Sequence, residues 1–170
     1  NGKTTTSRLL AQLSRAQGKT CGVIGTLGAT LDDDIVEAVN TTPDAISLQR
    51  QLASWQQQGV LRVSMEVSSH ALVQGRVSGV EFTTAIYTNL SHDHLDYHGD
   101  MAAYARAKIR LFTTEGLQHA VVNIDDEYAP LIAAALPGDV QLVTYSTGGA
   151  EADIRTERVQ FDAQGSRGTL

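Results

Sequence analysis

Three observations predict an α/β fold with a mostly parallel sheet flanked by helices. Short apolar segments alternate along the chain with longer segments whose apolar residues recur at helical spacing. This alternation is typical of parallel strands joined by helices. Polar motifs follow the strand-like segments, as expected where ligands bind at the carboxyl ends of parallel strands. The length of 170 residues suits one domain, so residues 1–170 are treated as one.

The first part of the chain begins with a helical pattern. Three leucines recur at helical spacing within residues 4–17. Residues 21–24 form a strand-like segment, and residues 25–34 are predicted to form a loop with acidic residues at its end. A second helix is expected to open at residues 42–44, Thr-Pro-Asp, because threonine can cap a helix and proline suits the first helical position. Gly59 is placed to end that helix.

The alternation continues to the end of the chain. Strands are predicted over residues 60–67, 84–88, 120–122 and 140–145, and helices over residues 100–112 and 126–136. Asp100 can cap the first of these helices, and the polar residues before it form a loop. Spaced apolar residues near the end of the chain give a weaker β signal.

Composition excludes several classes of protein. The chain has 13 Lys+Arg against 19 Asp+Glu, a net charge of −6, which argues against a nucleic-acid binder. No apolar run approaches the roughly 18 residues that a membrane span requires. A lone cysteine, Cys21, cannot form an internal disulfide. We therefore expect a cytoplasmic protein that binds neither nucleic acid nor membrane.

Residues 1–6 read Asn-Gly-Lys-Thr-Thr-Thr, the back half of the phosphate loop G-x-x-x-x-G-K-[ST]. Glycine lets the backbone approach phosphate, Lys3 can reach the β- and γ-phosphates, and Thr4 can bind Mg²⁺. The helix that follows points its first N–H groups at the anion. A lysine before an ordinary helix is the alternative, because the upstream glycine and strand are not in the sequence.

Glu66 follows a strand-like segment and has apolar neighbours, so it is expected to be buried and to need a partner. A Mg²⁺ held together with Thr4 would be such a partner, and a glutamate that reaches water from a sheet edge is the alternative. Beyond it, Ser68, Gln74 and Arg76 are expected to form a polar pocket in which arginine can bind a carboxylate or phosphate. A plain surface turn is the alternative there.

Three of the five histidines lie within residues 89–100, together with several aspartates. Histidine and aspartate can bind a divalent cation. Zinc is the rival metal, although the segment has no cysteine partner and no H-E-x-x-H spacing. Spacing does not decide which histidine is a ligand. Lys108, in the next predicted helix, reads from the pattern alone as a basic residue on a solvated face.

Four segments together resemble the Mur ligases. They are N-G-K-T-T-T at 1–6, N-T-T-P at 40–43, M-E-V-S-S-H-A-L-V-Q-G-R at 65–76 and T-N-L-S-H-D-H-L-D-Y-H-G-D at 88–100. The last two are specific to the branch that adds the third amino acid. The resemblance implies a P-loop NTPase-like central domain, truncated at both ends. It also implies an N-terminal domain for the uridine end of the substrate and a C-terminal domain that closes over ATP and selects the amino acid.

The resemblance implies an ATP-dependent amide ligase of peptidoglycan synthesis. Such an enzyme joins UDP-MurNAc-L-Ala-D-Glu to a free amino acid, diaminopimelate or otherwise lysine, through an acyl phosphate. We expect ATP as co-substrate, two Mg²⁺ ions, a monomer, and little activity from the 170-residue chain by itself. Another Mur ligase, a folylpolyglutamate synthetase-like enzyme and a nucleotide-binding module without turnover are the alternatives.

The resemblance also assigns roles to single residues. The ATP phosphates would be bound by Asn1, Gly2, Lys3, Thr4 and Thr5. The UDP-MurNAc-dipeptide would be bound by Asn40, Thr41, Thr42, Ser68, Gln74 and Arg76. The Mg²⁺ ligands would be Thr4, Glu66, His94 and Lys108, the last after carbamylation by CO₂ has turned its cation into an anion. Lys3, His94 and Lys108 would be the catalytic residues.

Overall fold

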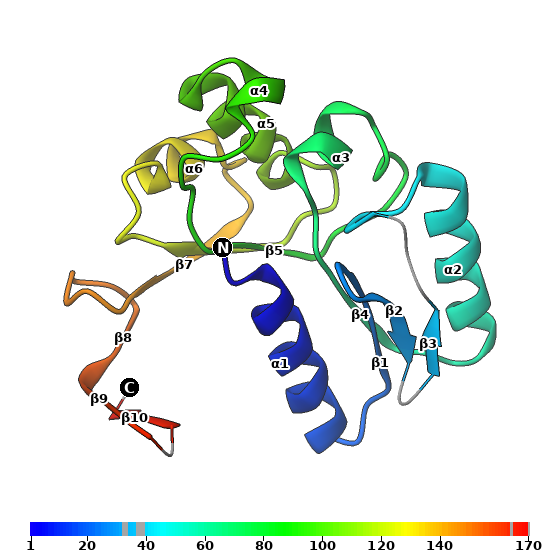
Figure 1. Cartoon of the computed structure of the whole chain (residues 1–170), viewed down its shortest axis with the longest axis horizontal. Helices are drawn as coiled ribbons and strands as arrows, with labels where there is room; N and C mark the ends of the chain where they lie inside the picture. The colour runs from blue at the N-terminus through cyan, green and yellow to red at the C-terminus, as the bar shows by residue number, and fades with distance from the viewer. Residues whose placement is uncertain (32–33, 37–39, 164, 170) are drawn as a thin grey trace. The chain divides into compact units, whose positions relative to one another are not determined.

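A computed structural model describes residues 1–31, 34–36, 40–163 and 165–169. The chain divides into two compact units. The first unit comprises Gly2–Val80, and the second comprises Glu81–Leu170 together with Asn1. Figure 1 labels the helices and strands of both units.

The first unit is built on a four-stranded sheet in the order β3-β2-β1-β4. Its strands are β1 (Cys21–Gly25), β2 (Gly28–Leu31), β3 (Asp34–Val36) and β4 (Arg62–Met65). β1 is parallel to β4, whereas β2 is antiparallel to both β1 and β3. β1 and β2 form a hairpin in which Gly25 pairs with Gly28, so Thr26 and Leu27 alone connect the two strands.

The predicted loop over residues 25–34 is therefore wrong. The structure forms β2 and begins β3 within it, and Asp32 and Asp33 lie outside the described residues. The strand Gly-Ala-Thr-Leu is short and has a single large apolar residue, so its own pattern carries little β signal. Pairing with β1 supplies the hydrogen bonds that the local sequence does not predict.

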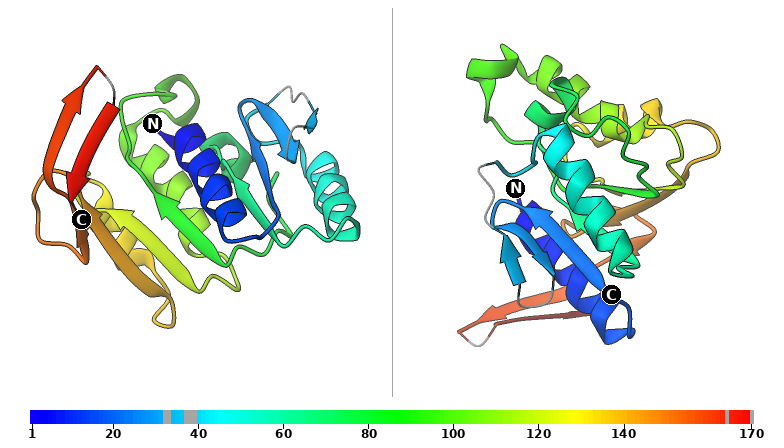
Figure 2. Two further views of the ribbon diagram at one scale, coloured as in Figure 1. Left: turned by 90° about the horizontal axis from the view of Figure 1, so that it is seen from below. Right: turned by 90° about the vertical axis from the view of Figure 1, so that its right-hand side faces the viewer.

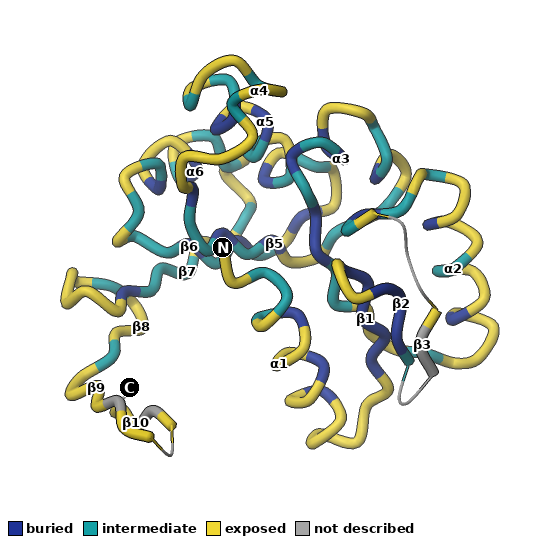
Figure 3. Tube along the Cα trace, viewed as in Figure 1, coloured by how far each residue is buried: buried dark blue, intermediate teal, exposed yellow. Residues whose placement is uncertain are grey.

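Two long helices cover opposite faces of β1. The helices of this unit are α1 (Lys3–Ala16), α2 (Ala45–Gln57) and the short α3 (Ser69–Val73). Ala11 of α1 packs against Cys21 and Val23. Trp55 of α2 lies over Gly22, where a Cβ would come within 2.5 Å of the indole ring. Because alternate strand residues point to opposite faces, α1 and α2 enclose β1, which is buried along its length (Figure 3).

The cap of α2 differs from the predicted one. Asp44, not Thr42, is the N-cap, and its carboxylate accepts hydrogen bonds from the N–H groups of Ile46 and Ser47. The hydrogen bonds from Ser47 hold the pKa of the Asp44 carboxyl below its usual value. The Thr42 hydroxyl is thereby left for a different set of contacts.

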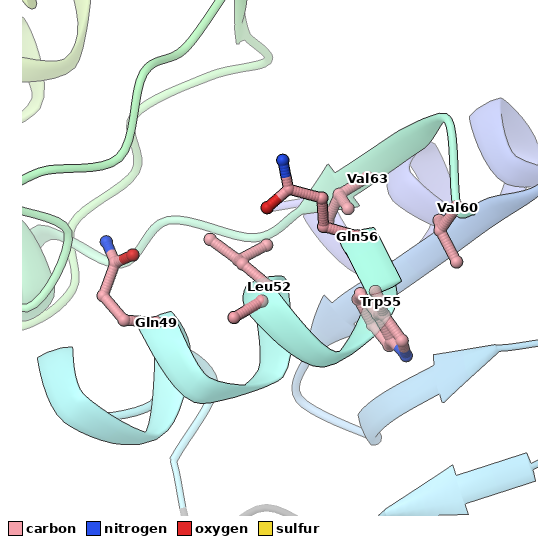
Figure 4. Close-up of a pocket in the computed structure, with 7 residues that line it drawn as sticks. Gln49, Leu52, Trp55, Gln56, Val60 and Val63 are labelled. Atoms are coloured by element: carbon pink, nitrogen blue, oxygen red, sulfur yellow. The ribbon is translucent and has the colours of Figure 1, made fainter. Parts of the chain in front are cut away.

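A groove of about 290 Å³ opens between α2 and β4 (Figure 4). It is lined by Gln49, Leu52, Ala53, Trp55, Gln56, Val60 and Val63. None of these side chains titrates or binds a metal. The groove is thus a feature of helix–sheet packing, and the polar motifs of the sequence lie elsewhere.

The second unit contains an all-parallel sheet in the order β5-β6-β7-β8. Its strands are β5 (Thr84–Tyr87), β6 (His119–Asn123), β7 (Gln141–Ser146) and β8 (Ile154–Arg155). The weak β signal near the end of the chain corresponds to β8 and to a separate hairpin of β9 (Glu157–Asp162) and β10 (Gly165–Thr169), drawn in red in Figure 2.

Helices α5 and α6 pack on one face of this sheet. The helices of the second unit are α4 (Leu95–His98), α5 (Met101–Phe112) and α6 (Ala129–Ala135). Phe112 of α5 and Ile132 of α6 join one core cluster with Tyr87, Ala120 and Val122 of the strands. Asp100 caps α5 as predicted, because its carboxylate accepts the N–H of residue 103 at 2.6 Å.

The predicted fold class, an α/β protein with parallel strands flanked by helices, is confirmed. The β1–β4 pair and the whole β5–β8 sheet are parallel, and the predicted helices lie within one to three residues of the observed ones. Among the described residues, no helix combines the length and apolar character needed to cross a membrane.

The packing of α2 predicts different effects for two of its apolar residues. Leu48 is fully buried, whereas Ile46 is 65% exposed. We expect Leu48→Ala to lower the free energy of unfolding by about 2–5 kcal/mol, because it leaves a cavity. The control Ile46→Ala should change it by less than about 0.5 kcal/mol. Urea denaturation followed by Trp55 fluorescence measures both, and equal losses would contradict this placement of α2.

Candidate active site

The predicted phosphate loop lies at the N-terminus of α1. Gly2 is the N-cap, with a left-handed φ of 81° that glycine adopts without strain. Lys3, Thr4 and Thr5 form the first helical turn, and the N–H of Thr6 bonds to the Gly2 carbonyl at 2.9 Å. The earlier N–H groups of the turn have no partner within an α-helix, which is the arrangement that binds phosphate.

Glu66 follows β4 and is buried, with 3% of its surface exposed. Its carboxylate accepts hydrogen bonds from the Thr4 hydroxyl at 3.0 Å, from the Thr26 N–H at 3.0 Å and from the Thr26 hydroxyl at 3.3 Å. Its predicted burial is confirmed, and the alternative of a glutamate that reaches water is wrong. The structure also brings Thr4 and Glu66 together, two residues that are 62 positions apart in the sequence.

The side chains of Thr4 and Glu66 are suited to binding Mg²⁺. A carboxylate and a hydroxyl are oxygen donors of the kind that Mg²⁺ prefers. The three donors that reach Glu66 are neutral, so they satisfy its oxygens without balancing the charge of a buried carboxylate. A cation bound beside Thr4 would supply that balance.

Gly25 makes the position of Glu66 possible. A Cβ built on Gly25 would collide with the side chain of Glu66. The nearest atoms are Oε1 and Cδ of its carboxylate and the adjacent Cγ. The last residue of β1 therefore has to lack a side chain for the carboxylate to lie against it.

This contact predicts the effect of adding one methyl group. Gly25→Ala should lower the free energy of unfolding by about 1–3 kcal/mol, since Glu66 must move from its hydrogen-bonding partners. Gly138→Ala is the matched control: a Cβ there meets no atom within 4 Å, and a change below about 0.5 kcal/mol is expected. Thermal unfolding of the two variants compares them. Equal melting temperatures would show that the carboxylate does not lie on Gly25.

Four of the predicted substrate residues, Thr42, Ser68, Gln74 and Arg76, form one hydrogen-bonded network with Glu66. The Thr42 hydroxyl is fully buried; it donates to the Glu66 carbonyl at 2.9 Å and accepts from the Ser68 N–H at 3.0 Å. Arg76 donates to the Thr42 carbonyl at 3.0 Å and to the Gln74 side-chain oxygen at 2.8 Å. Gln74 and Arg76 thus lie in a turn that is tied to Thr42, and their role in substrate binding stays a prediction.

Two further predicted substrate residues lie at the edge of the network. The hydroxyl oxygens of Thr41 and Thr26 are 3.2 Å apart, which links Thr41 to the carboxylate of Glu66 through Thr26. Asn40 precedes Thr41 and is exposed. Thr26 is not among the residues predicted from the sequence. Its position directly after an apolar strand is the signal by which it could have been found.

In the second unit, His94 and Lys108 contact the same aromatic ring. The ring centroids of His94 and the buried Tyr104 are 6.0 Å apart, and the Lys108 Nζ lies 5.6 Å from the Tyr104 centroid. The ring of His98 stacks on that of Tyr104, with the two centroids 4.8 Å apart. The two predicted metal ligands of this unit are thus neighbours, although they are 14 positions apart in the sequence.

His94 has a constrained backbone. Its φ of 55° is left-handed, and its N–H donates to the Asp93 carboxylate at 2.9 Å. The Asp93 oxygen also lies 3.5 Å from Nδ1 of His94. A carboxylate at one ring nitrogen orients an imidazole whose other nitrogen binds a metal.

The described residues do not form the zinc site that is the alternative for the histidines and aspartates of residues 89–100. No three side chains among His, Cys, Asp and Glu converge on one point in the part of the chain that the structure describes. Cation binding at His94 would therefore need hydroxyl, phosphate or carbamate oxygens in addition.

The loop that carries His94 is anchored by hydrogen bonds to Asp126 and to Asn1. Asp126 accepts hydrogen bonds from the Leu90 N–H at 2.8 Å and from the Tyr87 hydroxyl at 2.7 Å. Burial, followed by the contact with Asp126, raises the pKa of Tyr87, so the phenol stays a donor. The side chain of Asn89 pairs with the main-chain nitrogen and carbonyl of Asn1, at 2.8 and 3.1 Å.

The predicted site residues thus fall into two groups. Thr4, Glu66 and the substrate residues form one group in the first unit, and His94 and Lys108 form another in the second unit. Their convergence on one ATP molecule stays a prediction.

The whole chain, residues 1–170, matches the family model described as the Mur ligase middle domain. The chain therefore belongs to the Mur ligase family. The fold and the phosphate loop at α1 agree with this assignment.

Several curated proteins are similar to the chain. UDP-N-acetylmuramoyl-L-alanyl-D-glutamate–2,6-diaminopimelate ligase of Alkalilimnicola ehrlichii is 49% identical over 168 residues, 98% of this chain and 34% of the relative. The protein of the same name from Pseudomonas aeruginosa is 43% identical over 170 residues, 100% of this chain and 35% of the relative. The chain thus spans about a third of the length of the curated relatives that it matches.

A solved structure of a protein with the same name superimposes on the full chain. The TM-score is 0.87 at 39% sequence identity, and the match covers 100% of this chain and 37% of the other.

Proposed function

We propose that this chain is the ATP-binding part of a ligase that adds diaminopimelate to UDP-MurNAc-L-Ala-D-Glu in peptidoglycan synthesis. The observation that carries the proposal is the network that joins the phosphate loop, through Thr4 and Glu66, to the substrate residues Thr42, Ser68 and Arg76. The names of the relatives support diaminopimelate over lysine as the added amino acid. We further propose a cytoplasmic location, since ATP is a cytoplasmic co-substrate, and a monomeric state.

In the proposed reaction, the γ-carboxylate of the dipeptide attacks the γ-phosphorus of ATP. The bond to ADP breaks, and an acyl phosphate forms. The amine of the free amino acid then attacks the acyl carbon, loses a proton and expels phosphate, which leaves the amide. Phosphoryl transfer of this type depends mainly on positioning and on neutralising phosphate charge.

The chain's own residues supply both of these requirements. Gly2 and the first turn of α1 would present main-chain N–H groups to the phosphates, Lys3 would add a positive charge, and Asn1 would lie beside them. Arg76 can bind a carboxylate of the dipeptide, because its guanidinium presents several donors in one plane. Thr41 and Ser68 add hydroxyl groups to the same network, through Thr26 and Thr42 respectively.

Thr4, Glu66, His94 and Lys108 as a carbamate would hold the two proposed Mg²⁺ ions. Bound there, Mg²⁺ would neutralise charge on the transferring phosphoryl group. Carbamylation joins CO₂ to the lysine amine with release of a proton, and the product supplies two oxygens. The contact of Lys108 with Tyr104 beside His94 supports its place in this set.

The role of Lys108 can be tested by substitution. In the full-length enzyme, Lys108→Ala should lower turnover by about 100-fold or more, because it removes the proposed carbamate oxygens. Added short carboxylic acids should restore part of the activity. Lys19→Ala, a change at an exposed lysine, is the control and should keep full turnover. Wild-type rates in Lys108→Ala would rule out the proposed role.

A substrate panel tests the proposed function itself. ATP-dependent phosphate release by the full-length protein should require UDP-MurNAc-L-Ala-D-Glu together with diaminopimelate, and lysine in its place should give a much lower rate. The isolated 170-residue chain should show little activity, because it spans about a third of the relatives' length. Turnover only with a folate substrate, or only with another UDP-MurNAc-peptide, would favour the alternative ligases. ATP binding without turnover would favour a nucleotide-binding module.

A further inference from the structure

We propose that Thr26 is a positioning residue that couples Thr41, at the dipeptide-binding edge, to the carboxylate of Glu66. The inference rests on the proposed function, because it assigns the role of a residue within that site. Thr26 lies in the two-residue connection between β1 and β2, directly after Gly25. The hairpin thus places its main chain and its side chain at the carboxyl end of a buried strand.

Thr26 contacts Glu66 through two different groups. Its N–H donates to one carboxylate oxygen at 3.0 Å, and its hydroxyl donates to the other at 3.3 Å. The main-chain bond forms whichever side chain residue 26 carries. Only the second bond, together with the contact to Thr41, depends on the threonine.

The hydrogen-bond direction in this chain of hydroxyls follows from the carboxylate. An ionised carboxylate only accepts, so the single hydrogen of the Thr26 hydroxyl is used toward Glu66. The Thr41 hydroxyl, 3.2 Å away, is then the donor in its contact with Thr26. Thr41 is left with acceptor capacity toward a ligand, and it would receive a hydrogen bond from an N–H or O–H of the substrate.

The coupling has a consequence for both ligands of the site. A substrate that holds Thr41 in place also holds the Thr26 hydroxyl on Glu66, and a fixed Glu66 favours the same orientation of Thr41. Linked sites of this kind strengthen each other's binding. Because Thr26 is an exposed residue in a turn, its substitution should leave the fold intact.

The test compares isosteric and conservative variants of the full-length enzyme. Thr26→Val keeps the shape and the main-chain N–H but removes the hydroxyl, whereas Thr26→Ser keeps the hydroxyl. We expect Thr26→Val to weaken UDP-MurNAc-dipeptide binding about 5- to 10-fold, measured by isothermal titration calorimetry without ATP or metal. Thr26→Ser should bind within about twofold of the wild type, as should the control Leu27→Ala in the same connection.

Kinetics and a double variant separate coupling from a general structural effect. Thr26→Val should raise the KM for the dipeptide and for Mg²⁺ more than it lowers kcat. The Thr26→Val, Thr41→Val double variant should bind the dipeptide no more weakly than Thr41→Val alone, since both changes break the same chain of hydroxyls. Additive losses would overturn the coupling.

The outcomes distinguish this inference from the proposed function. If the wild-type enzyme binds and uses the dipeptide while Thr26→Val binds it equally well, only the inference is overturned. If the wild-type enzyme neither binds nor uses the dipeptide, the proposed function fails and the inference fails with it.

Discussion

The burial of one carboxylate governs the organisation of the first unit. Glu66 is only 3% exposed, and a carboxylate in such a place is tolerated only where hydrogen bonds reach its oxygens. The neighbouring residues meet this requirement together. Gly25 leaves room for the carboxylate, and Thr4 and Thr26 donate hydrogen bonds to it. Thr42 donates a hydrogen bond to the main-chain carbonyl of Glu66. The N-terminus of α1, the β1–β2 hairpin and the segment that carries Thr42 therefore all contact Glu66, through its side chain or its main-chain carbonyl.

The sequence predicts those features that local chemistry determines. The α1 and α5 helices, the Asp100 cap and the burial of Glu66 follow from apolar spacing, capping residues and apolar flanks. β2 was missed because its strand signal comes from pairing with β1 and not from its own residues. The sequence predicts Thr42 as a helix cap, but a threonine hydroxyl can equally take part in a buried hydrogen-bond network. Only the tertiary contacts show that Asp44 is the cap and that Thr42 bonds to Glu66.

The candidate site was predictable as a set of residues but not as a set of contacts. The link from Thr41 through Thr26 to Glu66, and the anchoring of Leu90 by Asp126, join residues 15 to 40 positions apart. Nothing in a spacing pattern encodes such pairs. In the second unit, likewise, no sequence pattern indicates that Tyr104 contacts both His94 and Lys108.

The two-residue connection between β1 and β2 limits how this region can vary. Gly28, Ala29 and Thr30 of β2 are all buried, so an inserted residue that shifted the register of β2 against β1 would place a different residue at each packed position. A deletion would leave too little chain to reverse direction. The turn should therefore accept changes of side chain at Leu27 far more readily than any change of length.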